Sequence, residues 1–168
     1  MENYVANVIP HLQQWWPVVL TLSYLIGLIF AIVSLFQSVD HKNKFNRMTA
    51  VWTFVSAVLL SNLPSMLDSM AMSIFNSGSE QSLSYSPPGS PGAVYIQFAV
   101  IAIRFVGLIG IARGICLLRG VSSQPGNLSR GIVHMVGGII AVNLVTFLQG
   151  IGATIGGDVQ SYIAKIIG

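Results

Sequence analysis

Apolar residues fill most of the chain, and short polar stretches interrupt them. The first stretch carries no charged side chain from residue 3 to 39, and its most apolar part covers the 21 positions 17–37. About 20 such residues cross a hydrocarbon layer of roughly 30 Å as a helix. Trp15 and Trp16 precede Pro17, where aromatic rings favour the headgroup layer and proline suits a first helical turn. This pattern predicts a first membrane span that begins near Pro17.

A second apolar stretch covers residues 48–60 and soon meets Pro64. Proline interrupts the helical hydrogen-bond ladder. Either one kinked helix therefore runs to Phe75, or a short span ends near Leu63 and a new helix begins at Pro64. The second alternative is favoured by an apolar stripe after Pro64, opposite serines and Asp68, which suits a helix that lies in the membrane interface. The stripe consists of Met66, Leu67, Met70, Ala71, Ile74 and Phe75.

The second half repeats this layout after a polar loop rich in proline, glycine and serine. A third apolar stretch covers residues 93–118, a basic loop follows at 119–130, and a fourth stretch is uncharged from 131 to 157. We therefore expect three regions: an N-terminal hydrophobic helical hairpin with a basic turn, residues 1–75; a polar, solvent-exposed connector, residues 76–92; and a glycine-rich C-terminal helical hairpin with a short tail, residues 93–168.

Composition agrees with this pattern over the whole length. Hydrophobic residues make up 53% of the chain and charged residues 8%, with a mean hydropathy of +0.72; a soluble domain has about 25% charged residues. The predicted class is an all-α membrane protein of about four hydrophobic helices in two hairpins, with an interfacial helix after Pro64 as the alternative to a kink. The single Cys116 excludes a disulfide within the chain and is expected to be a small packing residue.

Basic residues predict the orientation, because Lys and Arg near membrane spans stay on the cytoplasmic side. They occupy the first and third connectors, whereas the second connector carries only Glu80. We therefore expect a multi-pass protein of a bacterial inner membrane with both termini in the periplasm. The candidate contacts to lipid headgroups or to a lumen are Lys42, Lys44, Arg47, Arg104, Arg119 and Arg130. Membrane lipid is the expected ligand, with bound anionic phospholipid in place of any other cofactor.

Topology also accounts for the isoelectric point of about 9.3. Direct sequence-specific nucleic-acid binding is not expected, because no basic stripe alternates with stacking aromatic residues.

Small residues recur at helical spacing in the second half, as in membrane helices that approach closely. The candidate helix-packing residues are Gly107, Gly110, Gly114, Gly131, His134, Gly138, Ala141, Gly152 and Gly156. These residues either hold one four-helix bundle together or join several copies into a homo-oligomer. The sequence supports both interpretations equally, since GxxxG patterns are common in membrane helices.

Arg104 lies near the middle of the third span, where a charge is costly unless it is shielded. Counting residues from the span ends puts it well below the outer surface and puts Asp68 near that surface. We therefore expect Arg104 to meet a polar partner such as Asn143 or Gln149, or to face a lumen shared by several copies. Arg113 is nearer the cytoplasmic end and is expected to snorkel.

The sequence offers no catalytic or metal-binding constellation. HExxH, CxxC, GxSxG and P-loop patterns are absent, five acidic residues are scattered, and three histidines lack ligand spacing. We therefore expect no enzymatic activity and no metal site, and we expect His134 to be hydrogen-bonded within a helix-packing face. A transporter should show paired intramembrane charges and repeat-related broken helices, and Pro64 provides one break without an evident counterpart.

Residues 131–143, GIVHMVGGIIAVN, follow a basic loop and resemble a known family. This stretch is similar to the C-terminal region of the small inner-membrane proteins of type IVB (Dot/Icm) secretion systems and I-type conjugation systems. The overall layout is most similar to the IcmC/DotE and TraQ branch. The resemblance implies a non-enzymatic membrane component of a machine that moves DNA or protein between cells, with other secretion or conjugation subunits as partners. It implies no catalytic residues.

A pilin-like subunit is the alternative. Conjugative pilins of other type IV systems are hydrophobic helical hairpins with a basic cytoplasmic turn, and they assemble with lipid into a helical pilus. Each half of this chain has that layout, although the whole chain is longer than one hairpin and shows no recognisable leader. A small transporter or channel is the third possibility.

Overall fold

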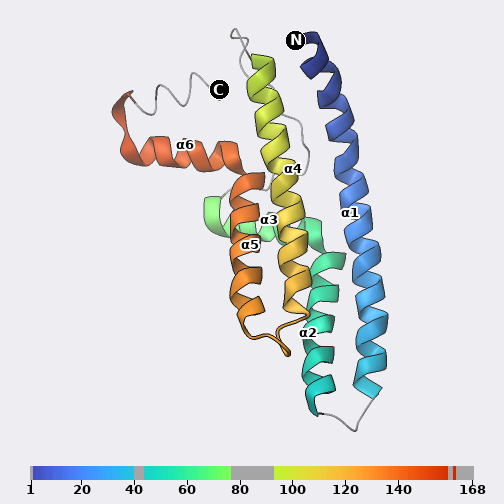
Figure 1. Cartoon of the computed structure of the whole chain (residues 1–168). Helices are drawn as coiled ribbons and strands as arrows, with labels where there is room; N and C mark the ends of the chain where they lie inside the picture. The colour runs from blue at the N-terminus through green and yellow to red at the C-terminus, as the bar shows by residue number, and fades with distance from the viewer. Residues whose placement is uncertain (1, 40–43, 77–92, 159–160, 162–168) are drawn as a thin grey trace.

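The computed structural model describes residues 2–39, 44–76, 93–158 and 161, and nearly all of them lie in helices and turns. Within these ranges the protein is all-α, as predicted, and no strand is present. Figure 1 shows the helices α1 (Glu2–Val39), α2 (Lys44–Ser61), α3 (Leu63–Phe75), α4 (Ala93–Leu118), α5 (Gly126–Val142) and α6 (Leu144–Ile155).

Two of these helices, α1 and α4, are long and apolar enough to cross a membrane on their own. The pairs α2–α3 and α5–α6 also qualify when each is taken as one broken span, which gives two to four spans in the described residues. The chain is therefore a membrane protein. Its first helix is longer than predicted, because α1 begins at Glu2 and contains both Pro10 and Pro17. Tryptophans favour the headgroup level, but a helix can continue beyond it.

A sharp bend at Asn62 decides between the two alternatives for Pro64. α2 ends at Ser61, α3 begins at Leu63 with Pro64 in its first turn, and the two helices meet at 84°. The missing N–H of proline costs nothing in a first turn, where that group has no helical partner. A new helix therefore starts here, and its buried residues are Leu63, Met66, Leu67 and Ala71. Ile74, which the predicted stripe includes, is exposed.

A second bend divides the predicted fourth span. α5 ends at Val142, α6 begins at Leu144, and they meet at 82°, so the fourth stretch does not form one continuous helix to residue 157. The break has no proline. Instead Asn143 repeats the geometry of Asn62, because each amide nitrogen donates to the carbonyl four residues earlier, at 3.0 Å. Asparagine favours such local bonds over a continuous helix. The Pro64 break therefore has a counterpart in the second half.

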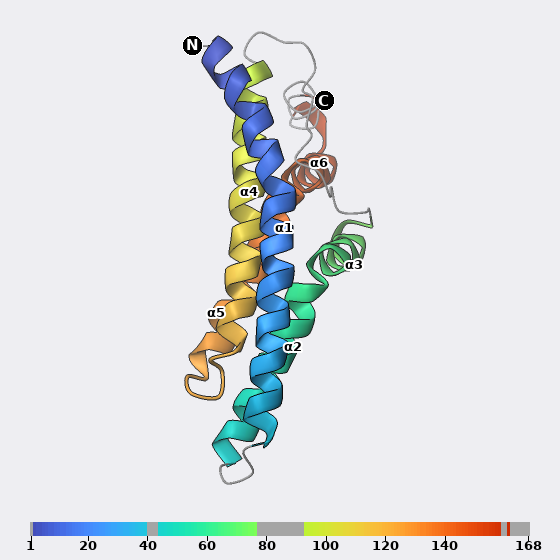
Figure 2. The same cartoon turned by 90° about the vertical axis from the view of Figure 1, so that its right-hand side faces the viewer.

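The two halves have the same architecture. In each, a long helix descends, a shorter helix returns beside it, and a third leaves crosswise, so α4–α6 repeat α1–α3 in the same direction (Figures 1 and 2). Gly27 of α1 contacts α2 at Ala57, and Gly107 of α4 contacts α5 at Gly138. The equivalent positions lie 80 residues apart in the long helices (27 and 107) and 81 apart in the returning helices (57 and 138).

The core lies where the second hairpin packs on the first. α4 contacts both α1 and α2, and the Ser56 hydroxyl donates to the Ile115 carbonyl at 3.1 Å. The crosswise helices α3 and α6 also touch, through an edge-to-face contact of Phe75 with Phe147. The largest fully buried apolar side chains come from both halves: Leu60, Leu63, Leu67, Ile101, Leu108, Ile111, Ile115, Ile139 and Val142.

Two adjacent glycines in α5 should respond oppositely to alanine. A Cβ on Gly138 would lie 2.6 Å from the Gly107 carbonyl oxygen and would overlap Ile111, whereas a Cβ on Gly137 has nothing within 4 Å. We expect Gly138→Ala to destabilise the protein by about 1–3 kcal/mol through overpacking. Gly137→Ala should add up to about 1 kcal/mol of helix propensity. Thermal unfolding followed by circular dichroism in detergent micelles compares them, and equal melting temperatures would contradict the α4–α5 packing.

Candidate assembly surface

Glycines bring the backbones of α4 and α5 into contact at two levels. A Cβ on Gly107 would lie 2.8 Å from the Gly138 carbonyl oxygen, and one on Gly114 would lie 2.7 Å from that of Gly131. Side chains larger than hydrogen would push the helices apart at both levels. Four predicted helix-packing glycines therefore act inside one chain, as the single-bundle interpretation requires.

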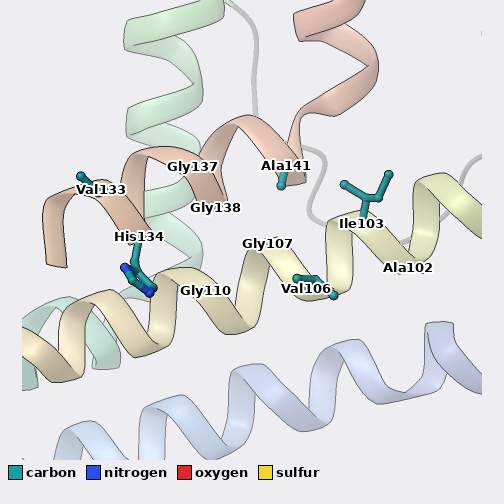
Figure 3. Close-up of a pocket in the computed structure, with 10 residues that line it drawn as sticks. All are labelled: Ala102, Ile103, Val106, Gly107, Gly110, Val133, His134, Gly137, Gly138 and Ala141. Carbon is teal, nitrogen blue, oxygen red and sulfur yellow. The ribbon is translucent and has the colours of Figure 1, made fainter. Parts of the chain in front are cut away.

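The outer side of the same hairpin is an apolar groove of about 510 Å³ between α4 and α5 (Figure 3). Small residues form its floor, and branched side chains stand at its edges. The lining residues are Ala102, Ile103, Val106, Gly107, Gly110, Val133, His134, Gly137, Gly138 and Ala141. Five of the nine predicted helix-packing residues thus lie along one surface that the rest of the described chain leaves open.

Two glycines in the groove are not needed for packing within the chain. A Cβ on Gly137 would have nothing within 4 Å, and one on Gly110 would meet only the His134 carbonyl oxygen at 3.8 Å. Glycine in a helix interior costs about 1 kcal/mol relative to alanine. Contacts among the described residues of one copy do not explain these two glycines.

His134 belongs to the groove and is hydrogen-bonded as expected. Its Nδ1 lies 2.8 Å from the Arg130 carbonyl oxygen. That oxygen can only accept, so Nδ1 carries the proton. Figure 3 shows the ring between α5 and α4, beside Gly110. The ring therefore forms part of a helix-packing surface.

Gly152 and Gly156 do not share a face with Gly131 and Gly138. That expectation assumed one continuous helix, and the bend at Asn143 turns α6 by 82°. Gly152 is buried within α6, whereas Gly156 caps the end of α6 with a φ of 72°. Such a positive φ strains other residues, so Gly156 ends the helix and does not pack it.

The candidate basic contacts fall into three groups. Arg47 and Arg130 are exposed at the end of the molecule where both hairpins turn, as headgroup contacts require. Arg119 is half-buried, with its guanidinium carbon 5.1 Å from the centre of the Phe30 ring, a cation–π contact between the halves. Lys42 and the side chain of Lys44 lie outside the described residues.

Arg104 is enclosed inside the fold, with 1% of its surface exposed. A single copy therefore gives it no surface with which to line a lumen, so that expectation is wrong. Asn143, one of its expected polar partners, is also buried, and its amide donates to the Ile139 carbonyl. Arg113 is exposed on the same helix, as a snorkelling residue should be. Cys116 is exposed too, contrary to the packing role that the sequence suggested.

The bend at Asn62 also changes the position of Asp68. α3 runs crosswise at the level where α2 ends, so Asp68 does not continue outward along a span. The depth that separated Asp68 from Arg104 in the sequence was counted along the wrong axis. Asp68 and Arg104 are therefore not separated by distance along a common helix axis.

Among the described residues, no group of three or more His, Cys, Asp or Glu side chains is placed to hold a metal ion. The lining of the groove is apolar, and its glycines allow close backbone approach. Sequence reasoning missed its edges, Ile103, Val106 and Val133, and the free glycine Gly137. The shared Asn-Leu pairs at residues 62–63 and 143–144 are the signal that would have aligned the halves and singled out these positions.

Comparison with protein-family models, curated proteins and solved structures finds no match to this chain.

Truncating Arg104 should destabilise the fold, because its long side chain fills space between packed helices. We expect Arg104→Ala to cost at least about 2 kcal/mol, as for other large-to-small changes in a core. Arg113→Ala, the matched control on the exposed side of α4, should change stability little. Thermal unfolding in micelles measures both, and an Arg104→Ala variant as stable as the Arg113→Ala variant would contradict the buried position.

Proposed function

We propose that this chain is a non-enzymatic, membrane-embedded subunit of a type IV conjugation or secretion apparatus of the IVB kind. It assembles through its glycine-rich helix faces and supports transfer of DNA or protein. The observation that carries this proposal is the open apolar groove between α4 and α5, whose floor includes two glycines that packing among the described residues does not require. A surface of this kind suits protein association in a membrane.

The resemblance to IcmC/DotE and TraQ-like proteins supports the same conclusion. It rests on residues 131–143, which form most of α5 and the Asn143 break. α5 provides one wall of the groove. The resembling segment therefore contributes five of the ten residues that line the candidate assembly surface.

The lengths of the returning helices suggest how the protein sits in the bilayer. α2 has 18 residues and α5 has 17, which correspond to about 27 Å and 25 Å at 1.5 Å per residue. Both are close to the roughly 30 Å of a hydrocarbon core. With the basic turns at the cytoplasmic surface, the crosswise helices α3 and α6 lie along the periplasmic interface.

This orientation predicts a labelling pattern. In a Cys116→Ala background, Ser122→Cys at the α4–α5 turn should resist a membrane-impermeant maleimide in intact cells and react after lysis. Tyr4→Cys, at an exposed site near the start of α1, should react in intact cells once the outer membrane is permeabilised. The opposite pattern would reverse the proposed topology.

A pilin-like subunit is the second candidate, and the parallel arrangement of the two hairpins favours it (Figure 1). The crosswise helices α3 and α6 are extra to a simple hairpin and suit a chain that stays anchored at an interface. A small transporter or channel comes third. The repeated breaks at Asn62 and Asn143 are a feature of transporters, but the groove is apolar and open, which suits a helix better than a polar solute.

Cell fractionation tests the proposal. In cells that make the apparatus, we expect the chain in the inner-membrane fraction and in complexes with other apparatus components, and we expect transfer to fail when it is deleted. Recovery of the chain from sheared surface filaments would instead support the pilin-like candidate. A strictly monomeric chain, found in no complex and no filament, would contradict both. Solute flux by the isolated protein in vesicles would identify a transporter.

A further inference from the structure

We propose that copies of this protein join head to tail, with the open groove of α4–α5 receiving the exposed outer face of α1–α2 from the next copy. The new contact repeats the one that already joins the two halves of each chain. The inference rests on the proposed function as a membrane assembly subunit and deepens it, because it names both surfaces and the partner.

The groove between α4 and α5 has an equivalent surface in the first half, between α1 and α2, and the second hairpin of the same chain covers that surface. By the shifts of 80 and 81 residues, Gly110 corresponds to Phe30 and Gly137 to Ser56. In the first half these positions face α4: Ser56 is fully buried and bonds to the Ile115 carbonyl, and Phe30 lies under Arg119. The same face of the second half is the groove, with Gly137 exposed. One face of the repeated hairpin is therefore filled by protein in one half and open in the other.

The inserted surface shows the reverse pattern. In the second hairpin, Leu108 and Ile115 of α4, the helix that contacts α1 and α2, and Met135 and Ile139 of α5 all belong to the buried core. Their equivalents in the first hairpin are exposed: Leu28 by 42%, Leu35 by 64%, Phe54 by 53% and Val58 by 45%. Each is a large apolar side chain, as the equivalent buried position is.

Positions that face the partner helix of their own hairpin provide an internal control. Gly107 and Gly114 are buried, and so are their equivalents Gly27 and Ser34. The contacts of these positions also match. The Ser34 hydroxyl donates to the Ala50 carbonyl at 2.9 Å, and the equivalent residues Gly114 and Gly131 are in close contact in the second hairpin. The difference between the halves is therefore confined to the two outer faces and does not reflect a generally looser first hairpin.

Side-chain sizes differ between equivalent positions of the two halves. At two positions the groove has a smaller side chain than the first half: Gly110 corresponds to Phe30, and Ala141 corresponds to Leu60. The smaller side chains make the groove deeper. The face that would meet it carries Phe54 where the second half has Met135, and Leu35 and Phe54 line a hollow of about 640 Å³ between α1 and α2 on that face. Exposed apolar residues alone say little in a membrane, where lipid covers them equally well. The second copy is indicated because protein already occupies the equivalent groove.

Because the groove and the inserted face are different surfaces, the contact is heterologous. Such contacts produce closed rings or open filaments, and they do not stop at a symmetric dimer. A chain that is itself two repeats joined by this contact would continue the same series from copy to copy.

Disulfide cross-linking between two single-cysteine variants tests this. By equivalence with Ser56 and Ile115, residue 137 of one copy should lie beside residue 35 of the next. In a Cys116→Ala background, Gly137→Cys and Leu35→Cys chains are co-expressed without any other apparatus component, and the membranes are oxidised. We expect dimers only when the two variants are mixed, and a ladder of higher multimers when one chain carries both cysteines.

Matched controls define the contact. Phe36→Cys, exposed on the neighbouring position of α1, should not cross-link to Gly137→Cys. Adding Gly150→Leu to both cross-linking partners should leave the dimer yield unchanged, because a Cβ at Gly150 also has nothing within 4 Å and lies outside the groove. A second pair tests whether the groove must be open. Here Val133→Cys, at the edge of the groove, is cross-linked to Leu35→Cys, which leaves position 137 free for a blocking substitution. Adding Gly137→Leu to the Val133→Cys chain should lower the yield of this cross-link at least tenfold. Circular dichroism checks that helix content is retained.

Three outcomes would overturn the inference. Dimers from either single variant alone would indicate a symmetric contact, and no cross-link between folded variants in membranes would exclude the contact. A Gly137→Leu substitution without effect would leave lipid as the occupant of the groove.

These outcomes are separate from failure of the proposed function. If the cross-links form but deletion of the chain leaves transfer intact, the interface stands and the secretion role fails. If transfer depends on the chain but no cross-link forms, the reverse holds.

Discussion

Close contact between two helix backbones, at two levels in each hairpin, is the constraint on which the rest of the fold depends. Small residues allow it: Gly27 and Ser34 in the first hairpin, Gly107 and Gly114 in the second. In lipid there is no hydrophobic gain from pairing apolar helices, so close packing must supply the attraction. Each hairpin is held together on a narrow line of contact, which leaves its two broad faces available for other helices.

The asparagine breaks follow from the same geometry. A returning helix that stays in contact with its partner ends after about one bilayer thickness, and the apolar residues that remain must lie somewhere other than in water. At Asn62 and Asn143 the side-chain amide bonds to the carbonyl of residue i−4, and the chain turns by more than 80°. α3 and α6 then pack on each other and on the hairpins, so the breaks join the halves.

Sequence patterns predicted the helical class, the two hairpins and the basic turns, because charge and hydropathy record contact with lipid and water directly. They also identified Gly107, Gly114, Gly131 and Gly138 as packing residues. They did not reveal the bend at Asn143, since an uncharged run looks the same whether it is straight or bent. Without the bend, Gly152 and Gly156 were assigned to the wrong face. The burial of Arg104 was foreseen only in part, because periodicity gives a face but does not say which neighbour covers it.

The repeated hairpin layout explains why one chain contains both an occupied and an open copy of the same surface. A pair of identical repeats joined face to back always leaves one receiving face and one inserted face without a partner. Selection against association would fill or charge these faces, as protein surfaces that must stay apart commonly are. Here the receiving face has Gly110 and Ala141 where the first half has Phe30 and Leu60, and the α1–α2 face exposes Leu28 and Leu35. The second half therefore has the deeper groove and not a closed surface, as expected if another copy occupies it.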